Sequence, residues 1–438
     1  MNKRIVLFWF ILISLNVASQ NVVVTGVALG QQDKLVRVIV YSDQFSNLEH
    51  TIAQTRTNQL GEFTMKFWVD ETQFAFLAFE LEKGEFYLSP GATYNFKIHT
   101  DTSSVGSIFD RLPLSFTLEA DDNGVQNAIG DFNATYNDFI YNNVASIYKS
   151  RDKSVVAKFV ADMQQKYSNN TSKYVSNYVD YSIAALLWLS RKESNSKVLE
   201  NYIINKPVLY NNIQYTDFFK EFFKSYFNTE KPYTYSELTM AINSNEGDAL
   251  SKLLLKDTLI VSDSRVLEIV EMLILDRNYH NRDVNKRMVM AKFNRITEQS
   301  KFIENKKIAN NFMDELIVMQ NGSPAPVFRL VNSDMDSVSL DSFKGKYVLL
   351  SFVKEDCNIC NFQMQLISDI KKDLDNKFEI ITVVAGNSTH KVADFANERG
   401  YNWPILKSGD NILLFEDYNV VAYPTYIFVN PDGTIAYA

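Results

Sequence analysis

Short apolar runs alternate with turn-forming residues in the first quarter of the chain. Glycine, serine, aspartate and proline separate these runs at intervals typical of small sheets. The runs that we predict to be strands are Val22–Val24, Val36–Val40, Phe63–Phe67, Phe74–Phe79 and Tyr94–Ile98. Many short strands at this spacing favour two packed sheets, so we predict a small antiparallel β-sandwich between residues 20 and 121.

After residue 121 the apolar residues recur at intervals of three and four positions. Val266, Ile269, Val270 and Leu273 are one such set, and similar sets occur earlier. This period is that of amphipathic helices with one buried face, so we predict a central all-α domain that covers residues 122–320. Its many Tyr and Phe side chains could form a carbohydrate-binding or partner-binding surface, but the filling of a helical core is the simpler interpretation.

A segment with one glycine and two prolines begins at residue 321 and marks a further boundary. Strand-like and helical stretches alternate beyond it. Tyr347–Val353, Phe378–Val384 and Tyr426–Val429 are apolar runs with the composition of strands, and Cys360–Leu374 has the composition of a helix. This alternation favours a layered sheet, so we predict a C-terminal α/β domain over residues 321–438.

The amino terminus has the pattern of a secretory signal peptide, which we place at residues 1–19. Lys3 and Arg4 precede the apolar stretch Ile5–Leu15, and small residues precede a cleavage site after Ser19. The stretch is shorter than the roughly 20 residues that cross a bilayer. We therefore predict export to the periplasm or cell envelope of a Gram-negative bacterium, without a stable membrane span after cleavage; an uncleaved signal anchor is the alternative.

The charge pattern argues against nucleic-acid partners. The formal net charge is −8, and no cluster of Lys and Arg is present, whereas nucleic-acid binding needs such a cluster to neutralise phosphates. The four histidines are scattered singly, and together with two cysteines they give no second ligand pair for structural zinc. We therefore predict no metal site.

The two cysteines of the chain, Cys357 and Cys360, form a C-x-x-C pair directly after an apolar strand candidate. A disulfide that closes so short a loop stabilises a fold little, so thiol-disulfide exchange is the better interpretation. If a helix starts near Cys357, its free N–H groups and positive end favour a thiolate there. Cys357 is then the predicted nucleophile, and Cys360, one turn further, is the resolving cysteine.

The last domain also contains five motifs in a characteristic order. They are Gly-Ser-Pro-Ala-Pro-x-Phe-x-Leu, Leu-x-x-Phe-Lys-Gly-Lys-Tyr-Val-Leu-Leu-x-Phe, the C-x-x-C pair, Tyr-Asn-Val-Val-Ala-Tyr-Pro-Thr and Asn-Pro-Asp-Gly-Thr-Ile. Their order and spacing resemble the thioredoxin-like fold, and in particular the exported TlpA-like disulfide reductases related to the peroxiredoxin branch. The resemblance implies a protein-disulfide oxidoreductase with no cofactor beyond the redox-active disulfide Cys357–Cys360. Its implied partners are thiol- or disulfide-bearing envelope proteins and an electron donor.

The resemblance also implies a substrate-binding segment at Tyr423, Pro424 and Thr425. In the resembled family this proline is cis and lies beside the cysteine pair. A proline has no N–H group, which leaves the neighbouring backbone free to pair with an extended substrate segment. Pro424 is therefore predicted to position the substrate, with Tyr423 and Thr425 on either side.

Several residues depart from the family pattern. Asp356 replaces a frequent Trp, Ile359 replaces the usual Pro, Ser351 stands where thioredoxin has a buried acid, and Asn387 stands where several relatives have Glu. The proton-transfer group is therefore unassigned, although His390 is one candidate. These departures motivate an alternative function, in which the chain is an envelope interaction or binding protein that carries a degenerate, weakly active thioredoxin-like domain.

The β-rich first part has a resemblance of its own. It contains, in order, Val-Thr-Gly, Val-Ile-Val-Tyr, Thr-x-x-x-Gly-x-Phe and Tyr-Leu-x-Pro-Gly-x-x-Tyr. This series is similar to the transthyretin-like or DUF4369-type β-sandwich that precedes thioredoxin domains in exported proteins of Bacteroidetes. The resemblance covers roughly a hundred residues and names no chemical group, so it implies a fold and no activity.

Overall fold

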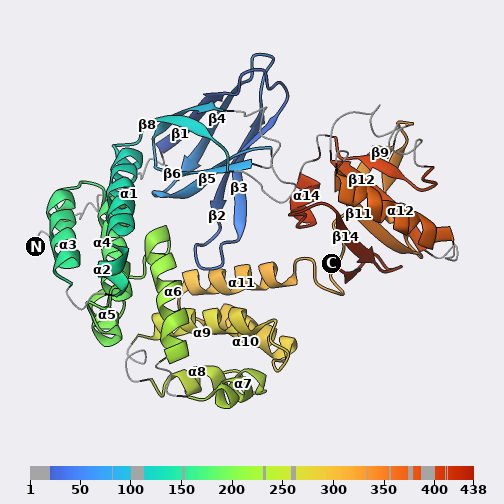
Figure 1. The fold of residues 1–438 in the computed structure, drawn as a ribbon. Coiled ribbons are helices and arrows are strands. Elements are labelled where there is room, and N and C mark those ends of the chain that lie inside the picture. The colour runs from blue at the N-terminus through green and yellow to red at the C-terminus, as the bar shows by residue number, and fades with distance from the viewer. Residues whose placement is uncertain are drawn as a thin grey trace, which may run out of the picture.

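The structure is a computed structural model with a β region, a helical region and a C-terminal α/β domain along the chain (Figure 1). The residues that it describes are 20–80, 82–99, 113–149, 153–229, 233–257, 263–332, 334–354, 357–372, 378–385, 400–409, 411 and 413–438. The predicted signal peptide lies outside these residues. Within them, no helix has both the length and the apolar composition that a bilayer span requires.

The β region consists of two four-stranded sheets, with the strand orders β4-β1-β7-β8 and β3-β2-β5-β6. The strands are β1 (Gln20–Val27), β2 (Leu35–Tyr41), β3 (Glu49–Arg56), β4 (Glu62–Val69), β5 (Gln73–Phe79), β6 (Glu82–Leu88), β7 (Thr93–Ile98) and β8 (Phe116–Asp121). The five predicted strands are confirmed as β1, β2, β4, β5 and β7. Both sheets bury side chains in one shared core, for example Val24 and Phe96 from the first sheet and Val38 and Leu77 from the second.

One strand pair departs from the predicted antiparallel arrangement. β1 runs parallel to β7, whereas the other neighbours in these two sheets are antiparallel. Parallel neighbours need a long connection. Here the connection from β1 to β7 contains β4 of the same sheet and all four strands of the second sheet. The apolar pattern also does not predict β3, because this edge strand is mostly polar and exposed.

The helical region contains eleven helices within the described residues. They are α1 (Val125–Asn142), α2 (Val144–Tyr148), α3 (Ser154–Tyr167), α4 (Lys173–Leu189), α5 (Asn195–Tyr202), α6 (Ile213–Thr229), α7 (Tyr235–Asn243), α8 (Ala249–Leu254), α9 (Ser264–Asn278), α10 (Lys286–Gln299) and α11 (Ile303–Ile317). Phe218, Phe219, Phe222 and Phe223 of α6 are all buried in one core. These aromatic residues therefore fill a helical core, as the simpler interpretation predicts.

The C-terminal domain is built on a seven-stranded sheet with the order β10-β9-β13-β12-β11-β14-β15. Its elements are β9 (Arg329–Asn332), β10 (Ser337–Ser339), β11 (Tyr347–Lys354), α12 (Asn358–Lys372), β12 (Phe378–Ala385), β13 (Ile405–Lys407), α14 (Leu413–Asp417), β14 (Thr425–Val429) and β15 (Ile435–Tyr437). The predicted strands are confirmed as β11, β12 and β14, and the predicted helix as α12. The pattern does not predict β13, α14 or β15, which are too short to show a period.

The central strand β11 separates two hydrophobic cores. It pairs in parallel with β12 and antiparallel with β14. Leu350 and Phe352 belong to the core on one face of the sheet. Leu349 and Val353 belong to the core on the other face, to which α12 also contributes. The end of β11 and the start of α12 therefore meet on this second face.

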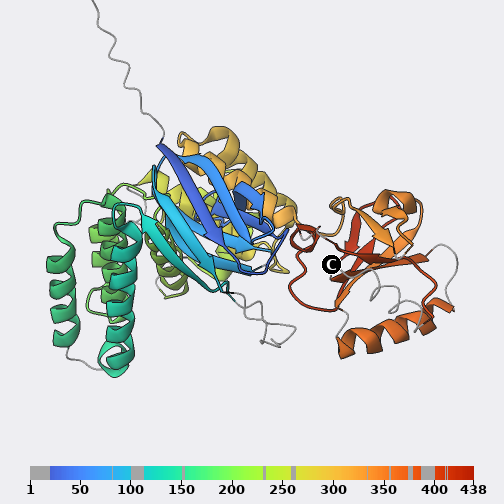
Figure 2. The ribbon, with the colours of Figure 1, turned by 90° about the horizontal axis from the view of Figure 1, so that it is seen from above.

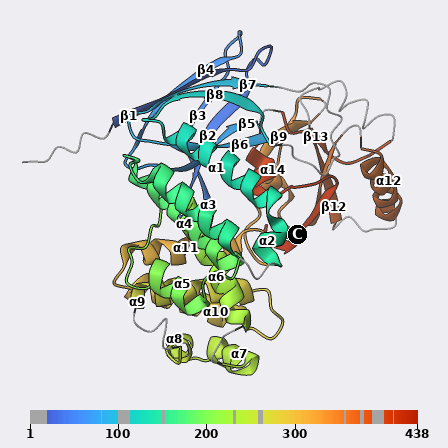
Figure 3. The same ribbon diagram turned by 60° about the vertical axis from the view of Figure 1, so that its left-hand side comes forward.

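A buried ion pair joins the β region to the C-terminal domain. The two Nη atoms of Arg37 donate to the Glu416 carboxylate at 2.7 and 2.8 Å, and Nη2 also donates to the carbonyl oxygen of Glu80 at 3.2 Å. Arg37 is only 2% exposed. Figures 1 and 3 show α14, which carries Glu416, beside the β region. Figure 2 shows the rest of the C-terminal domain to one side of the other two regions.

Candidate active site

The cysteine pair lies at the connection between β11 and α12 and in the first turn of that helix. β11 ends at Lys354 and α12 begins at Asn358, so Cys357 immediately precedes the helix. The N–H group of Cys360 donates to the Sγ atom of Cys357 at 3.1 Å. The two cysteines are joined by a disulfide bond. Because residues three apart share one side of a helical turn, the C-x-x-C spacing places both sulfur atoms together at the positive end of α12.

Both cysteines are buried. Cys357 is 1% exposed and Cys360 is 0% exposed. They share a core with Val353 of β11, Met364 of α12 and Trp403. A partner's sulfur atom can therefore reach Cys357 only after neighbouring side chains move.

A chain of neutral hydrogen bonds lies on the same face of the sheet. The hydroxyl groups of Ser351 and Thr382 are 2.7 Å apart, and the Trp403 indole N–H donates to Thr382 Oγ1 at 3.0 Å. Ser351 Oγ also lies 3.6 Å from the Sδ atom of Met364. Ser351 is fully buried, and it stands at the position where thioredoxin has a buried acid. The described buried polar residues of this domain carry hydroxyl groups and no carboxylates: Ser339, Ser351, Thr382 and Ser408.

The predicted substrate segment divides between two surroundings. The peptide bond between Tyr423 and Pro424 is cis, and the Tyr423 side chain packs against the core that contains the cysteines. The Thr425 hydroxyl donates to the carbonyl oxygen of Ala422 at 2.7 Å. Thr425 lines a cleft of about 900 Å³ to which the β region and the helical region also contribute. The structure thus brings Tyr423, but not Thr425, to the cysteine core.

Tyr426 is a residue of this face that the sequence motifs do not single out. It lies directly opposite Ser351 on the neighbouring strand, and its side chain packs against the cysteine core. Its hydroxyl group is buried and makes no hydrogen bond with any described residue. Burial, and secondarily the nearby Tyr401, raises the pKa of Tyr426 to about 12. Alternation along β14 from Pro424 is the signal that places Tyr426 on a sheet face, but the unpartnered hydroxyl needs the structure.

Of the other residues that the sequence singles out around the cysteine pair, Ile359 is described and three are not. Asp356, Asn387 and His390 lie outside the described residues. Ile359, between the two cysteines, is 47% exposed. In the part of the chain that the structure describes, no group of three or more His, Cys, Asp or Glu side chains could hold a metal ion.

The comparisons to known proteins concern the C-terminal domain. The AhpC/TSA family profile matches residues 321–438. The thioredoxin-like protein YneN of Bacillus subtilis is 34% identical over 122 residues, which cover 27% of this chain and 69% of that protein. The thiol-disulfide oxidoreductase ResA of the same organism is 30% identical over 118 residues, which cover 27% of this chain and 65% of that protein. Among solved structures, the thioredoxin domain of a Bacteroides vulgatus thiol-disulfide oxidoreductase has 28% identity and a TM-score of 0.25, and covers 27% of this chain and 86% of that one.

Through its C-terminal domain the chain belongs to the AhpC/TSA family, and this domain has a thioredoxin-like fold of the thiol-disulfide oxidoreductase type. The chain spans about two thirds of the length of the two curated relatives. These matches cover about a quarter of the present chain. The thioredoxin-like resemblance of the last domain is thus confirmed, whereas the roles of the site residues stay predictions.

Proposed function

We propose that the protein is an exported thiol:disulfide oxidoreductase that exchanges disulfides with envelope proteins through Cys357 and Cys360. The observation that carries this proposal is the position of Cys357 at the start of α12, with the Cys360 N–H group 3.1 Å from its Sγ atom. A helix N-terminus and a donated hydrogen bond both stabilise a thiolate at that sulfur. Cys357 is therefore the nucleophile of the proposed reaction.

In the reducing direction, the Cys357 thiolate attacks one sulfur of a partner's disulfide. A mixed disulfide forms, and the other partner sulfur leaves as a thiolate. Cys360 then gives up its proton, which passes to the partner thiolate, and attacks Cys357 Sγ. The Cys357–Cys360 bond forms, and the second partner sulfur leaves as a thiolate that takes a proton from water, so the partner is released as a dithiol. A dithiol electron donor restores the reduced pair by the reverse steps.

Pro424 supports this proposal as the residue that positions the partner. It offers no N–H group, so a partner's extended segment can pair with the backbone beside it. Tyr423 packs against the cysteine core, and we assign it to the wall of the same binding surface. Thr425 lies next to them at the start of β14.

The signal-peptide pattern of residues 1–19 supports export. The curated relatives that match include a thioredoxin-like protein and a thiol-disulfide oxidoreductase, which supports the proposed chemistry. We also infer that the two sheets of the β region form a sandwich of the transthyretin-like or DUF4369 type, because they share one core.

Reduction of insulin disulfides, with dithiothreitol as the electron donor, tests the exchange. The wild type should accelerate the reaction, and Cys357→Ser should abolish the acceleration. Cys360→Ser should accumulate a mixed disulfide, because the resolving step is lost. Equal rates for wild type and Cys357→Ser would remove the basis of the proposal.

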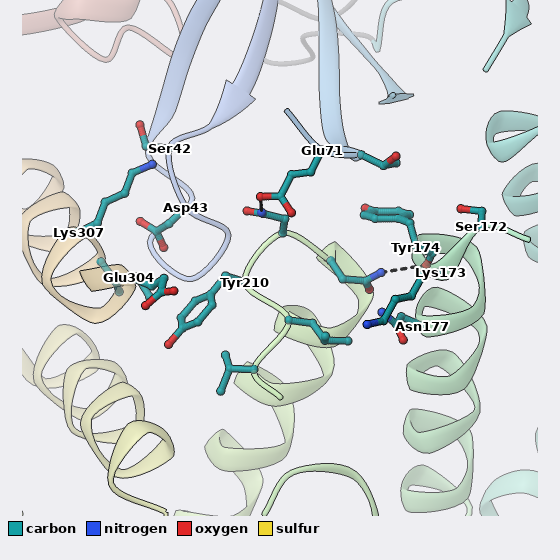
Figure 4. Close-up of a pocket in the computed structure, with 16 residues that line it drawn as sticks. Ser42, Asp43, Glu71, Ser172, Lys173, Tyr174, Asn177, Tyr210, Glu304 and Lys307 are labelled. Carbon is teal, nitrogen blue, oxygen red and sulfur yellow. Dashed lines mark hydrogen bonds between the residues drawn. The ribbon is translucent and has the colours of Figure 1, made fainter. Parts of the chain in front are cut away.

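A second candidate function, an envelope binding protein with a weakly active redox domain, is favoured by a separate cavity. This cavity of about 680 Å³ lies between the β region and the helical region. Figure 4 shows Asp43 and Tyr210 on one side of it and Tyr174 and Asn177 on the other. A hydrogen bond joins the two regions beside this cavity: the Asn311 amide of the helical region donates to the Asp43 carboxylate of the β region at 2.7 Å.

The two functions differ in what the cysteines contribute. If binding is the function, a double variant with both cysteines changed to serine should recover the same envelope proteins by crosslinking as the wild type. It should do so even though insulin reduction is absent. If exchange is the function, loss of the cysteines should remove the partners that crosslink through disulfides.

A further inference from the structure

The position of Tyr426 is fixed by strand pairing. Tyr426 faces Ser351 across β14 and β11, and directly opposed residues of neighbouring strands lie on the same face of a sheet. Ser351 in turn contacts the Met364 sulfur at 3.6 Å. Met364 follows Cys360 by one turn of α12, so Tyr426 belongs to the side of the sheet that carries the cysteine pair.

The hydroxyl group of Tyr426 has no partner in the disulfide form. A buried hydrogen-bond donor without an acceptor costs free energy, and such groups are uncommon in folded proteins. The neighbouring polar groups are already bonded to one another, because Ser351 pairs with Thr382 and Thr382 also accepts from Trp403. Tyr426 is therefore a donor that lacks an acceptor while the disulfide is closed.

Opening the disulfide creates an acceptor on this face. When a partner thiolate attacks Cys357 Sγ, the Cys357–Cys360 bond breaks and its electron pair leaves on Cys360 as a thiolate. Cys360 is 0% exposed, and a buried anion needs a hydrogen-bond donor or a proton. The described buried residues of this domain include no carboxylic acid that could supply one.

We propose that, when the disulfide is open and Cys360 is a thiolate, the Tyr426 hydroxyl group donates a hydrogen bond to the Cys360 sulfur atom. This inference rests on the exchange reaction proposed above. It makes Tyr426 the hydrogen-bond donor to the Cys360 thiolate, since Ser351 is already bonded to Thr382. The tyrosine keeps its proton throughout, so the step moves no proton and needs no further reactant.

The surroundings of Tyr426 suit a donor that does not ionise. Burial raises the pKa of Tyr426 to about 12, so the hydroxyl keeps its proton at physiological pH. Among the described residues, Tyr401 is the other titratable group that raises this pKa. Lys371 lies further along the face, with its Nζ atom 5.5 Å from the centroid of the Trp403 ring.

Titration of Cys360 as the only thiol tests the proposal. In a Cys357→Ser background, the thiolate absorbance near 240 nm reports the ionisation of Cys360. Adding Tyr426→Phe should lower the ratio of thiolate to thiol about tenfold at a given pH, since a hydrogen bond to a charged group is lost. Tyr437→Phe is the matched control, because Tyr437 is 69% exposed on the neighbouring strand β15, and it should leave the titration unchanged.

The redox equilibrium of the intact pair gives a second readout. In dithiothreitol buffers at pH 9, Tyr426→Phe should shift the equilibrium severalfold toward the disulfide, because only the open form loses a bond. Its oxidised form should unfold no more easily than the wild type. Tyr426→Leu, which also lacks the hydroxyl group, serves if the Phe variant does not fold.

Identical titrations and equilibria for wild type and Tyr426→Phe would overturn the inference. That outcome differs from a failure of the proposed function, which would appear as insulin reduction that does not depend on Cys357. A shifted Cys360 titration in a protein that reduces no insulin would uphold the hydrogen bond and reject the exchange reaction.

Discussion

The helical region encloses a charged cluster, whereas the described buried polar groups beside the disulfide of the C-terminal domain are neutral. In the helical region, Glu271 is 1% exposed and accepts from Arg295 Nη2 at 2.7 and 2.8 Å. The buried Lys292 ammonium donates to the carbonyl oxygens of Ser244 and Glu246. Fixed charges thus hold helices and loops in one arrangement.

The face of the C-terminal domain that carries the cysteines works differently. Ser351, Thr382 and the Trp403 indole are bonded to one another on this face, and the buried Tyr426 hydroxyl has no partner among the described residues. A fixed buried charge beside a sulfur would shift its ionisation, and this face instead offers neutral donors. The comparison shows two uses of buried polar groups. In the helical region, paired charges hold the structure in place, whereas in the C-terminal domain neutral donors can stabilise a thiolate that forms only during the proposed reaction.

The largest effect is expected when the charged cluster is broken. Glu271→Ala leaves Arg295 partly buried without its carboxylate, which should lower the free energy of unfolding by about 4 kcal/mol. Urea denaturation followed by circular dichroism measures the change. The double replacement of Glu271 and Arg295 by Met is the control, and it should cost far less because no guanidinium is left without its carboxylate, while Lys292 keeps its two carbonyl partners. Equal losses for the single and double variants would show that the ion pair does not set this stability.

A smaller effect is expected at the ion pair between regions. Glu416→Ala leaves Arg37 buried, but the carbonyl oxygen of Glu80 still accepts from it. Because the Glu416 side chain is 23% exposed, we expect a loss of about 2 kcal/mol, below the range for fully buried pairs. Small-angle scattering should show a larger radius of gyration as the C-terminal domain separates. Glu49→Ala, which removes an exposed partner of Lys83, should change neither quantity.

The neutral face should be the less sensitive of the two. Ser351→Ala removes the hydroxyl partner of Thr382, which keeps its bond from Trp403. The expected loss is about 1 kcal/mol, the typical net value of one hydrogen bond, and thermal unfolding of the oxidised protein measures it. A loss as large as that of Glu271→Ala would contradict the contrast between the two regions. The exposed Ser337→Ala variant should have no effect.

The smallest effect concerns pH. Burial raises the pKa of Glu271 above its ordinary value of 4.5, although Arg295 and Ser251 act in the other direction. The folded protein therefore holds a proton at pH values where the unfolded chain has released it, so this contribution to stability declines as pH rises from about 4.5 through the raised pKa. Denaturation midpoints across this range should fall less steeply in Glu271→Gln than in wild type. Parallel slopes would show that Glu271 does not titrate differently in the two states.

The sequence allows prediction of those elements whose apolar residues have a clear period. β11, β12 and α12 follow from their composition, and the strand-to-helix position of Cys357 follows from them. The edge strand β3 is not predicted because most of its residues are polar. β13 and β15 are not predicted because they have three residues each. For such segments the hydrogen bonds to neighbouring strands decide the conformation, and these depend on tertiary structure.

The chemistry of the candidate site is predictable only in part. The C-x-x-C spacing identifies the sulfur pair, and the motif around Pro424 identifies the loop with the cis peptide bond. The burial of Cys357 and the unpartnered hydroxyl of Tyr426 depend on which side chains meet across the sheet. A pattern along one strand places Tyr426 on a face, but it does not say which donors on that face are already bonded.

The pairing of Arg37 with Glu416 has a consequence for the order of events during synthesis. The two residues lie 379 positions apart, and a ribosome adds roughly 5–20 residues per second. Between about 20 and 75 s therefore pass after Arg37 is made before its carboxylate exists. During that interval Arg37 has no carboxylate partner from the C-terminal domain. The pair forms only after Glu416 has been made, so the β region and the C-terminal domain are joined late in synthesis.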